Sequence, residues 1–190
     1  MKIGMLGGSF NPIHTGHLIL AQECWHRLKL DKVIFIPSYI QPLKTHEEPV
    51  SPADRLNMAR LAVHGDARFE VCTHELDKGG VSYSIDTIKH LREKYGPKAE
   101  LYFLTGSDSA EAMSMWKDID EILRLTRFVI VARPGWGAQG DYESRVTRLE
   151  MPAIEISSTM IRERVKDRQP IDYLVPRSVA EFIRDKGLYR

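Results

Sequence analysis

The sequence predicts an α/β fold: an open, mainly parallel sheet with helices on both faces and a small C-terminal helical extension. Two observations predict it. Short apolar segments bounded by turn residues alternate with longer segments of helical pattern, which implies right-handed crossovers between parallel strands. These segments are also short and mainly apolar, as strands buried on both faces are. With 190 residues, 43% of them hydrophobic, the chain is long enough for one domain with a full core.

Five apolar segments are predicted as strands, and a sixth is expected late in the sheet. They cover residues 3–6, 33–36, 69–72, 101–104, 128–132 and 153–156. Helices are predicted between them over about 16–30, 52–64 and 84–95, with a broken helix over about 108–125. Ser51 and Pro52 predict the N-cap and the first position of the second helix. Helices from about 158 and over about 178–186 would form the C-terminal part.

The composition excludes several classes of function. A formal net charge of +1 argues against a nucleic-acid coat or a polybasic membrane patch. No apolar run approaches the roughly 20 residues that a membrane span needs, and the N-terminus enters a strand without a signal-peptide pattern. Cys24 and Cys72 lack metal-ligand or Cys-x-x-Cys spacing, which favours buried thiols in a reducing compartment. We therefore expect a cytoplasmic protein without a nucleic-acid or membrane partner.

The segment 7–17, between the first strand and the first helix, is the most informative of the chain. Its glycine-rich start, Gly7-Gly8, frees backbone N–H groups to face an anion. His14 and His17 face the same way if the helix begins near Thr15. The spacing matches neither a dinucleotide fingerprint nor a Walker loop. No third metal ligand stands at a suitable spacing, so phosphate contact is favoured and no metal site is predicted.

The segment 156–162 predicts a second anion contact near the other end of the chain. Ser158 and Thr159 begin a helix, where N–H groups and hydroxyls point toward an anion. Arg162 follows one turn later, where a guanidinium can clamp a phosphate. Taken alone, the segment would be better interpreted as an ordinary N-cap with a surface arginine. Beside the first segment, phosphate binding is the better interpretation.

These two segments carry a resemblance to a known group of enzymes. Segment 7–17 resembles the opening signature of the nucleotidyltransferases with a His-x-Gly-His motif, here His14-Thr15-Gly16-His17. Their second signature, Ile-Ser-Ser-Thr-x-Ile-Arg, matches residues 156–162. Over nearly its whole length the chain is similar to the nicotinate-nucleotide adenylyltransferases. The resemblance implies a single nucleotidyltransferase domain over 1–190, with a Rossmann-like core over about 1–156 and a helical part over about 157–190.

The resemblance also implies roles for individual residues. The catalytic residues it implies are His14, His17, Lys44 and Arg162. It implies ATP contacts for Gly7, Gly8, Ser9, Phe10, His14, His17, Gly106, Asp108, Ile156, Ser158, Thr159 and Arg162. It implies contacts with nicotinate mononucleotide for Ser9, Lys44, Tyr83, Ser84, Thr87, Asp108, Trp116 and Arg133, with the indole of Trp116 stacked on the pyridine ring. The partners would be ATP, which carries Mg²⁺, and the mononucleotide; a homo-oligomer such as a dimer stays open.

Two residues depart from the family pattern. The usual Pro-Pro-His-Lys reads Gln41-Pro42-Leu43-Lys44, which removes an imidazole, and the usual Phe-Asp-Pro reads Phe10-Asn11-Pro12, which removes a charge. Other functions remain as alternatives. A related adenylyltransferase could use nicotinamide mononucleotide or phosphopantetheine, and the same fold could serve as a non-catalytic nucleotide sensor. A dehydrogenase is disfavoured because the dinucleotide fingerprint is missing.

Overall fold

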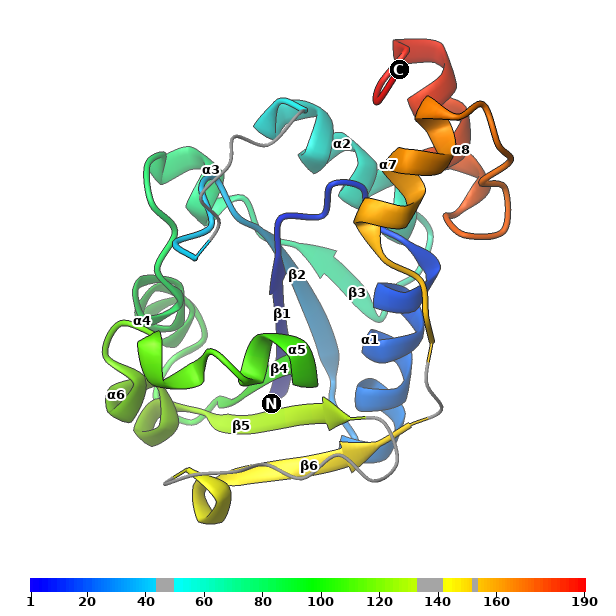
Figure 1. The fold of residues 1–190 in the computed structure, drawn as a ribbon. Coiled ribbons are helices and arrows are strands. Elements are labelled where there is room, and N and C mark those ends of the chain that lie inside the picture. Colours follow the sequence, from blue (N-terminus) through cyan, green and yellow to red (C-terminus); the bar gives the residue numbers. More distant parts are fainter. Residues whose placement is uncertain (44–49, 133–141, 152–153) are drawn as a thin grey trace.

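The sheet of this protein is parallel throughout its described strands (Figure 1). The computed structural model describes residues 1–43, 50–132, 142–151 and 154–190. Six strands pair in the order β3-β2-β1-β4-β5-β6, and every pairing is parallel. Their bounds are β1 (Lys2–Gly8), β2 (Lys32–Pro37), β3 (Phe69–Val71), β4 (Glu100–Gly106), β5 (Arg127–Ala132) and β6 (Val146–Glu150). The predicted open, parallel α/β sheet is confirmed.

Most predicted helices lie within a few residues of their expected positions. The long ones are α1 (Thr15–Leu28), α2 (Pro52–Val63), α4 (Ser84–Tyr95), α7 (Ser158–Lys166) and α8 (Arg177–Lys186). The broken helix is α5 (Ser107–Ala110), a 3₁₀ turn η1 (Met113–Met115) and α6 (Ile119–Leu125). Ser51 caps α2 as predicted, because its Oγ accepts the N–H of Asp54 at 3.1 Å. No described helix has the length and apolarity needed to cross a bilayer.

Helices cover both faces of the sheet because successive residues of a buried strand point to opposite sides. On one face Leu6 belongs to a core cluster with residues of α1, α2, α7 and α8. On the other face Met5 belongs to a cluster with residues of α4 and α6, and with Phe128 of β5. Figure 1 shows α1 on one side of the sheet and α4 with α6 on the other. Cys24 is buried and Cys72 half-buried, and both are free thiols.

The prediction of the sixth strand is wrong in position. The strand is β6 (Val146–Glu150), whereas residues 154–156 form no regular structure. As an edge strand, β6 exposes most of its side chains and buries only Leu149, so it lacks the apolar run of a central strand. Ile154 and Ile156 are apolar for a different reason: they pack against the core cluster on the path from β6 to α7. A short helix, α3 (His74–Lys78), and a 3₁₀ turn, η2 (Glu143–Arg145), were not predicted.

The strand order predicts where on the sheet a ligand would bind. The chain builds β1, β2 and β3 toward one side and then returns to add β4, β5 and β6 on the other. Ligands of such sheets bind outside the carboxyl ends of the strands at this switch point. The switch lies between β1, which ends in Gly7-Gly8, and β4, which ends in Gly106. Both glycine-bearing ends therefore open onto the same crevice.

Candidate functional site

The two histidines of segment 7–17 meet at the start of α1. His14 is the N-cap residue, and its ring stacks on that of His17 with centroids 3.6 Å apart and planes at 27°. The backbone N–H of His14 donates to Nδ1 of His17 at 3.2 Å. A ring nitrogen that accepts a hydrogen bond carries no proton, so neutral His17 bears its proton on Nε2. The three-residue spacing thus fixes both the orientation and the tautomer of His17.

Glycine between the histidines leaves room for the first ring. A Cβ on Gly16 would lie 3.0 Å from Nδ1 and 3.1 Å from Cε1 of His14, closer than a normal contact. A side chain at position 16 would therefore require the His14 ring to shift by a few tenths of an ångström. At the start of the segment, a Cβ on Gly7 would meet nothing within 4 Å, because the backbone there faces open space. The motif therefore combines an open backbone with two closely packed rings.

The buried ring of Phe10 holds the turn between β1 and α1 against the core. Its φ of 48° is uncommon for a residue with a side chain, and its ring is buried. The ring packs edge-on against His17 at 5.1 Å and against Phe35 of β2 at 5.8 Å. Hydrophobic packing thus holds the residues on either side of Phe10, including Ser9, in a fixed turn.

Burial keeps His14 neutral. Loss of hydration disfavours the charged imidazolium and lowers the pKa of His14 from its ordinary value of 6.5 to about 4. Its buried Nδ1 has no hydrogen-bond partner within the described part of the chain. A buried polar atom of this kind is costly unless something else satisfies it. At the N-cap of α1, the His14 ring is therefore a neutral group that can still form a hydrogen bond.

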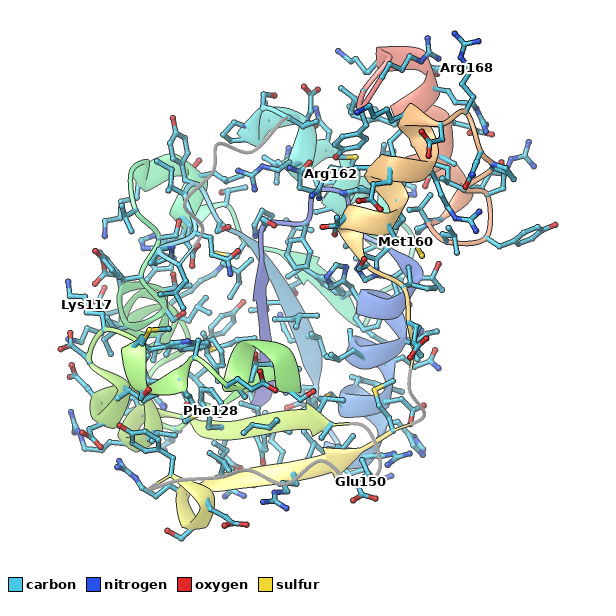
Figure 2. The ribbon with its side chains drawn as sticks, in the orientation of Figure 1. Lys117, Phe128, Glu150, Met160, Arg162 and Arg168 are labelled. Atoms are coloured by element: carbon cyan, nitrogen blue, oxygen red, sulfur yellow. The ribbon has the colours of Figure 1, made fainter. Side chains whose placement is uncertain are left out.

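The second predicted segment contacts the first directly. Ser157 caps α7 by accepting the N–H of Met160 at 3.1 Å. The hydroxyl of Ser158 donates to the carbonyl of Pro12 at 2.8 Å, and Nη1 of Arg162 donates to the carbonyl of Asn11 at 2.8 Å. Figure 2 shows Arg162 extending from α7 toward the loop after β1. The two segments that carry the sequence signatures therefore lie in direct contact.

The departure at Asn11 has a structural account. Asn11 is fully buried, and its Oδ1 accepts the hydroxyl of Tyr189 at 2.5 Å. The contact requires an oxygen acceptor, which an aspartate carboxylate and an asparagine amide both supply. Asn11 therefore keeps the acceptor of the family pattern while losing its charge.

A cavity of about 480 Å³ lies beside the glycine turn. The predicted residues Gly7, Gly8, Tyr83, Ser84 and Trp116 all line it. The indole of Trp116 packs edge-on against two aromatic rings of the core, Phe103 at 5.4 Å and Phe128 at 5.8 Å. Lys117 lines the cavity as well, and its Nζ lies 4.4 Å from the centre of the Tyr83 ring. The cavity thus combines aromatic walls with a cation.

Sequence reasoning missed two residues of this region. Glu75 of α3 lines the cavity, and burial raises the pKa of its carboxyl. The hydroxyl of the predicted Thr87 donates to Glu75 Oε1 at 2.6 Å, which places buried Thr87 behind the wall formed by Glu75. The second missed residue is Arg55 of α2, whose side chain is fully buried. Its signal was present, because Arg55 shares the four-residue spacing of the buried Ala59 and Val63.

The remaining predicted residues are placed as follows. Gly106 ends β4, and Asp108 lies in the first turn of α5. Ile156 is half-buried and Thr159 exposed near the start of α7, where Thr159 Oγ1 accepts Nη2 of Arg162 at 3.1 Å. Leu43, the other departure from the family pattern, is exposed and lines the cavity. Lys44 and Arg133 lie outside the described residues.

Known proteins resemble this chain over its full length. The family model of the cytidylyltransferase-like proteins matches residues 5–164. A probable nicotinate-nucleotide adenylyltransferase of Halalkalibacterium halodurans is 43% identical over 190 residues, covering 100% of this chain and 91% of that protein. A protein of Moorella thermoacetica with the same description is 42% identical over 200 residues, covering 100% and 92%. The nicotinic acid mononucleotide adenylyltransferase of Plasmodium falciparum, solved with NaAD, shares the fold with a TM-score of 0.80 at 18% identity, covering 99% and 97%.

The buried histidine predicts a pH dependence of stability. As the pH falls below 6.5, unfolded His14 takes up a proton, while folded His14 stays neutral until about pH 4. The folded state should therefore lose stability between pH 6.5 and 4, with no further loss from this group below pH 4. The full effect is about 3 kcal/mol. Urea unfolding of the wild type and of His14→Asn across this range measures it, with the exposed His26→Asn as control. Parallel pH curves for wild type and His14→Asn would contradict the assignment.

Proposed function

We propose that this chain, which belongs to the cytidylyltransferase-like family and within it to the nicotinate-nucleotide adenylyltransferases, transfers the adenylyl group of ATP to nicotinate mononucleotide. The products are nicotinate adenine dinucleotide (deamido-NAD) and pyrophosphate, in a step of NAD biosynthesis. One observation carries the proposal: Arg162 reaches the carbonyl of Asn11 at 2.8 Å, so both nucleotidyltransferase signatures lie in one site beside an aromatic cavity.

The triphosphate of ATP binds along segment 7–17, which we call the phosphate cradle. The open backbone at Gly7 and the turn through Gly8, Ser9 and Phe10 bind the phosphates, and Nε2–H of His17 donates to a phosphate oxygen. His14 contributes its neutral ring beside it. Across the cradle, the N-terminus of α7 offers the backbone of Ser158 and Thr159, and the guanidinium of Arg162 adds positive charge. Gly106, Asp108 and Ile156 form the adenosine side.

Nicotinate mononucleotide occupies the cavity, which we now call the acceptor cavity. Its pyridine ring stacks on Trp116, whose indole is held in place by Phe103 and Phe128. Tyr83 and Ser84 line the same space, with Thr87 supporting the wall through Glu75. Ser9 of the cradle follows Gly7 and Gly8, which line the cavity, and contacts the acceptor phosphate. We assign Lys44 and Arg133 to phosphate and acceptor contacts, respectively, and Lys44 joins His14, His17 and Arg162 as a catalytic residue.

The reaction needs positioning and charge stabilisation rather than a base. The acceptor phosphate is already ionised near neutral pH, and one of its oxygens attacks the α-phosphorus of ATP. The bond from the α-phosphorus to the bridging oxygen breaks, and pyrophosphate leaves with the electron pair. Hydrogen bonds from His14 and His17 and the charges of Lys44 and Arg162 stabilise the phosphoryl oxygens and the leaving group. Mg²⁺ arrives with ATP, since it prefers phosphate and water oxygens, and neutralises part of the triphosphate charge.

An acceptor screen tests the proposed function. Purified protein with Mg-ATP should release pyrophosphate when nicotinate mononucleotide is added, and the dinucleotide product should be detected by mass. Nicotinamide mononucleotide and phosphopantetheine serve as competing acceptors. Faster turnover with either of them would replace the proposed acceptor. Binding of ATP without pyrophosphate release from any acceptor would favour a nucleotide sensor.

The first site variant tests the cradle. His17→Ala removes one hydrogen-bond donor to the phosphates, so turnover should fall about 10²–10³-fold while the protein stays folded. His26→Ala is a matched control, because His26 lies exposed on the same helix away from the cradle. Steady-state kinetics and urea unfolding of both variants give the comparison. Near-normal turnover of folded His17→Ala would remove His17 from the catalytic residues.

The second site variant tests the acceptor cavity. Trp116→Ala should raise KM for nicotinate mononucleotide about tenfold, because one stacked ring contributes roughly 1–3 kcal/mol, and should change KM for ATP little. Trp25→Ala provides the control, since this half-buried indole packs against the core from α1 and contacts Arg68. If Trp116→Ala raised only KM for ATP, the two subsites would be exchanged.

A further inference from the structure

A buried arginine joins the phosphate cradle to the segment that follows β2. Nη1 of Arg55 donates to the carbonyl of Ser9 at 2.6 Å and to the carbonyl of Ser38 at 2.7 Å, and Nη2 donates to the carbonyl of Tyr39 at 3.0 Å. Ser9 follows β1, and Ser38 follows the neighbouring β2. A direct bond from the N–H of Ser38 to the carbonyl of Gly8, at 2.9 Å, runs alongside. One guanidinium thus holds two loops at the carboxyl edge of the sheet.

The segment after β2 continues the connection to the wall of the acceptor cavity. The N–H of Tyr39 donates to Oγ of Ser82 at 2.9 Å, and the N–H of Ser82 donates to the carbonyl of Ile40 at 2.9 Å. Ser82 is buried and immediately precedes Tyr83, which lines the cavity. Both the side chain and the backbone of Ser82 are therefore hydrogen-bonded to the segment after β2.

At this wall the network ends on Glu75, which also lines the cavity. The hydroxyl of Ser82 hydrogen-bonds to the Glu75 carboxyl, which also accepts the hydroxyl of Thr87. A continuous path of hydrogen bonds therefore runs from Ser9 in the cradle, through Arg55 and the 38–40 segment, to the residues that face the acceptor. Apart from Ser9, these residues lie outside both nucleotidyltransferase signatures.

We propose that Arg55 is a positioning residue that sets the phosphate cradle at a fixed distance from the acceptor cavity. The proposal rests on the proposed function, because the two subsites matter together only if their ligands react with each other. In-line transfer requires the acceptor oxygen to lie on the axis of the α-phosphorus and its leaving group. A displacement of about 1 Å from such a geometry can cost about 10²-fold in rate. Arg55 acts through the backbone carbonyls of Ser9, Ser38 and Tyr39.

The chemistry of the side chain explains why an arginine stands here. A planar guanidinium offers five donors in a rigid fork, so it can bond to three carbonyls at once without rearranging. A lysine ammonium is a flexible point charge that cannot reproduce this fork. The charged group also bonds directly to Ser9 of the cradle, where its positive field favours the phosphates.

The chain contains a matched control for a purely structural role. Arg92 of α4 likewise donates to three backbone carbonyls, those of Pro97, Ala99 and Leu125. Ala99 and Leu125 lie just before β4 and β5, at the amino edge of the sheet. Arg92 therefore links loops in the same way as Arg55, but at the edge opposite to the site.

The experiment compares Arg55→Met, Arg92→Met and the wild type. For Arg55→Met we expect kcat to fall about 10²-fold, with each KM within about threefold of the wild type, because each subsite survives but their relative placement is lost. Arg92→Met should lower the urea midpoint but leave kcat near that of the wild type. A normal kcat in Arg55→Met, an equal loss of kcat in both variants, or a loss confined to KM would each overturn the proposal.

Two milder variants decide the question if Arg55→Met does not fold. Ser82→Ala interrupts the same path between cradle and cavity wall, and should lower kcat in the same direction. Arg55→Lys should retain the charge but lose the fork, so it should stay well below the wild-type kcat. Wild-type kcat in both folded variants would overturn the proposal.

Equilibrium binding separates this proposal from the proposed function. In the wild type, an ATP analogue with a methylene bridge between the α- and β-phosphorus should change the calorimetric Kd of the acceptor, and Arg55→Met should abolish that change. The comparison uses whichever acceptor the wild type turns over, so a different acceptor would revise the function without touching Arg55. Equal coupling in wild type and Arg55→Met would overturn the role of Arg55 while leaving the function intact.

Discussion

The contact between the loop after β1 and the C-terminal helices is the constraint on which this site depends. The loop is buried, and buried backbone groups need hydrogen-bond partners. Arg162 and Ser158 supply them to the carbonyls of Asn11 and Pro12. Beyond the loop, the N–H of Thr15 at the start of α1 donates to the carbonyl of Leu174 at 2.9 Å. The cradle therefore takes its shape from residues more than a hundred positions away, and α7 cannot leave without exposing the loop.

The charges around the cradle divide between two kinds of group. His14 is kept neutral by burial, and His17 accepts a hydrogen bond on Nδ1 in its neutral form. Permanent positive charge comes instead from Arg55, which bonds to the carbonyl of Ser9, and from Arg162, which bonds to the carbonyl of Asn11. Guanidinium groups stay protonated throughout the pH range in which proteins work. Under the proposed function, the imidazoles therefore position the phosphates, and the two guanidinium groups, which do not titrate, neutralise part of their charge.

The sequence predicts the centre of this molecule better than its periphery. The first strand, the glycine turn and the helix from Thr15 follow from local signals, namely an apolar run, glycines and a change of periodicity. The edge strand β6 was misplaced because its side chains are mostly exposed, while the apolar Ile154 and Ile156 serve a connection. Arg55 and Glu75 were missed because their importance comes from partners distant in sequence. The spacing of Arg55 with Ala59 and Val63 indicates that Arg55 is buried, but it does not indicate the hydrogen bond to the loop after β1.

The hydrogen bond between Tyr189 and Asn11 has a consequence for how the protein is made. Residue 11 leaves the ribosome long before residue 189, which is made 178 positions later, and its buried side chain receives this partner only when residue 189 has emerged. A nascent chain can build the sheet before then, yet the loop after β1 still lacks this contact.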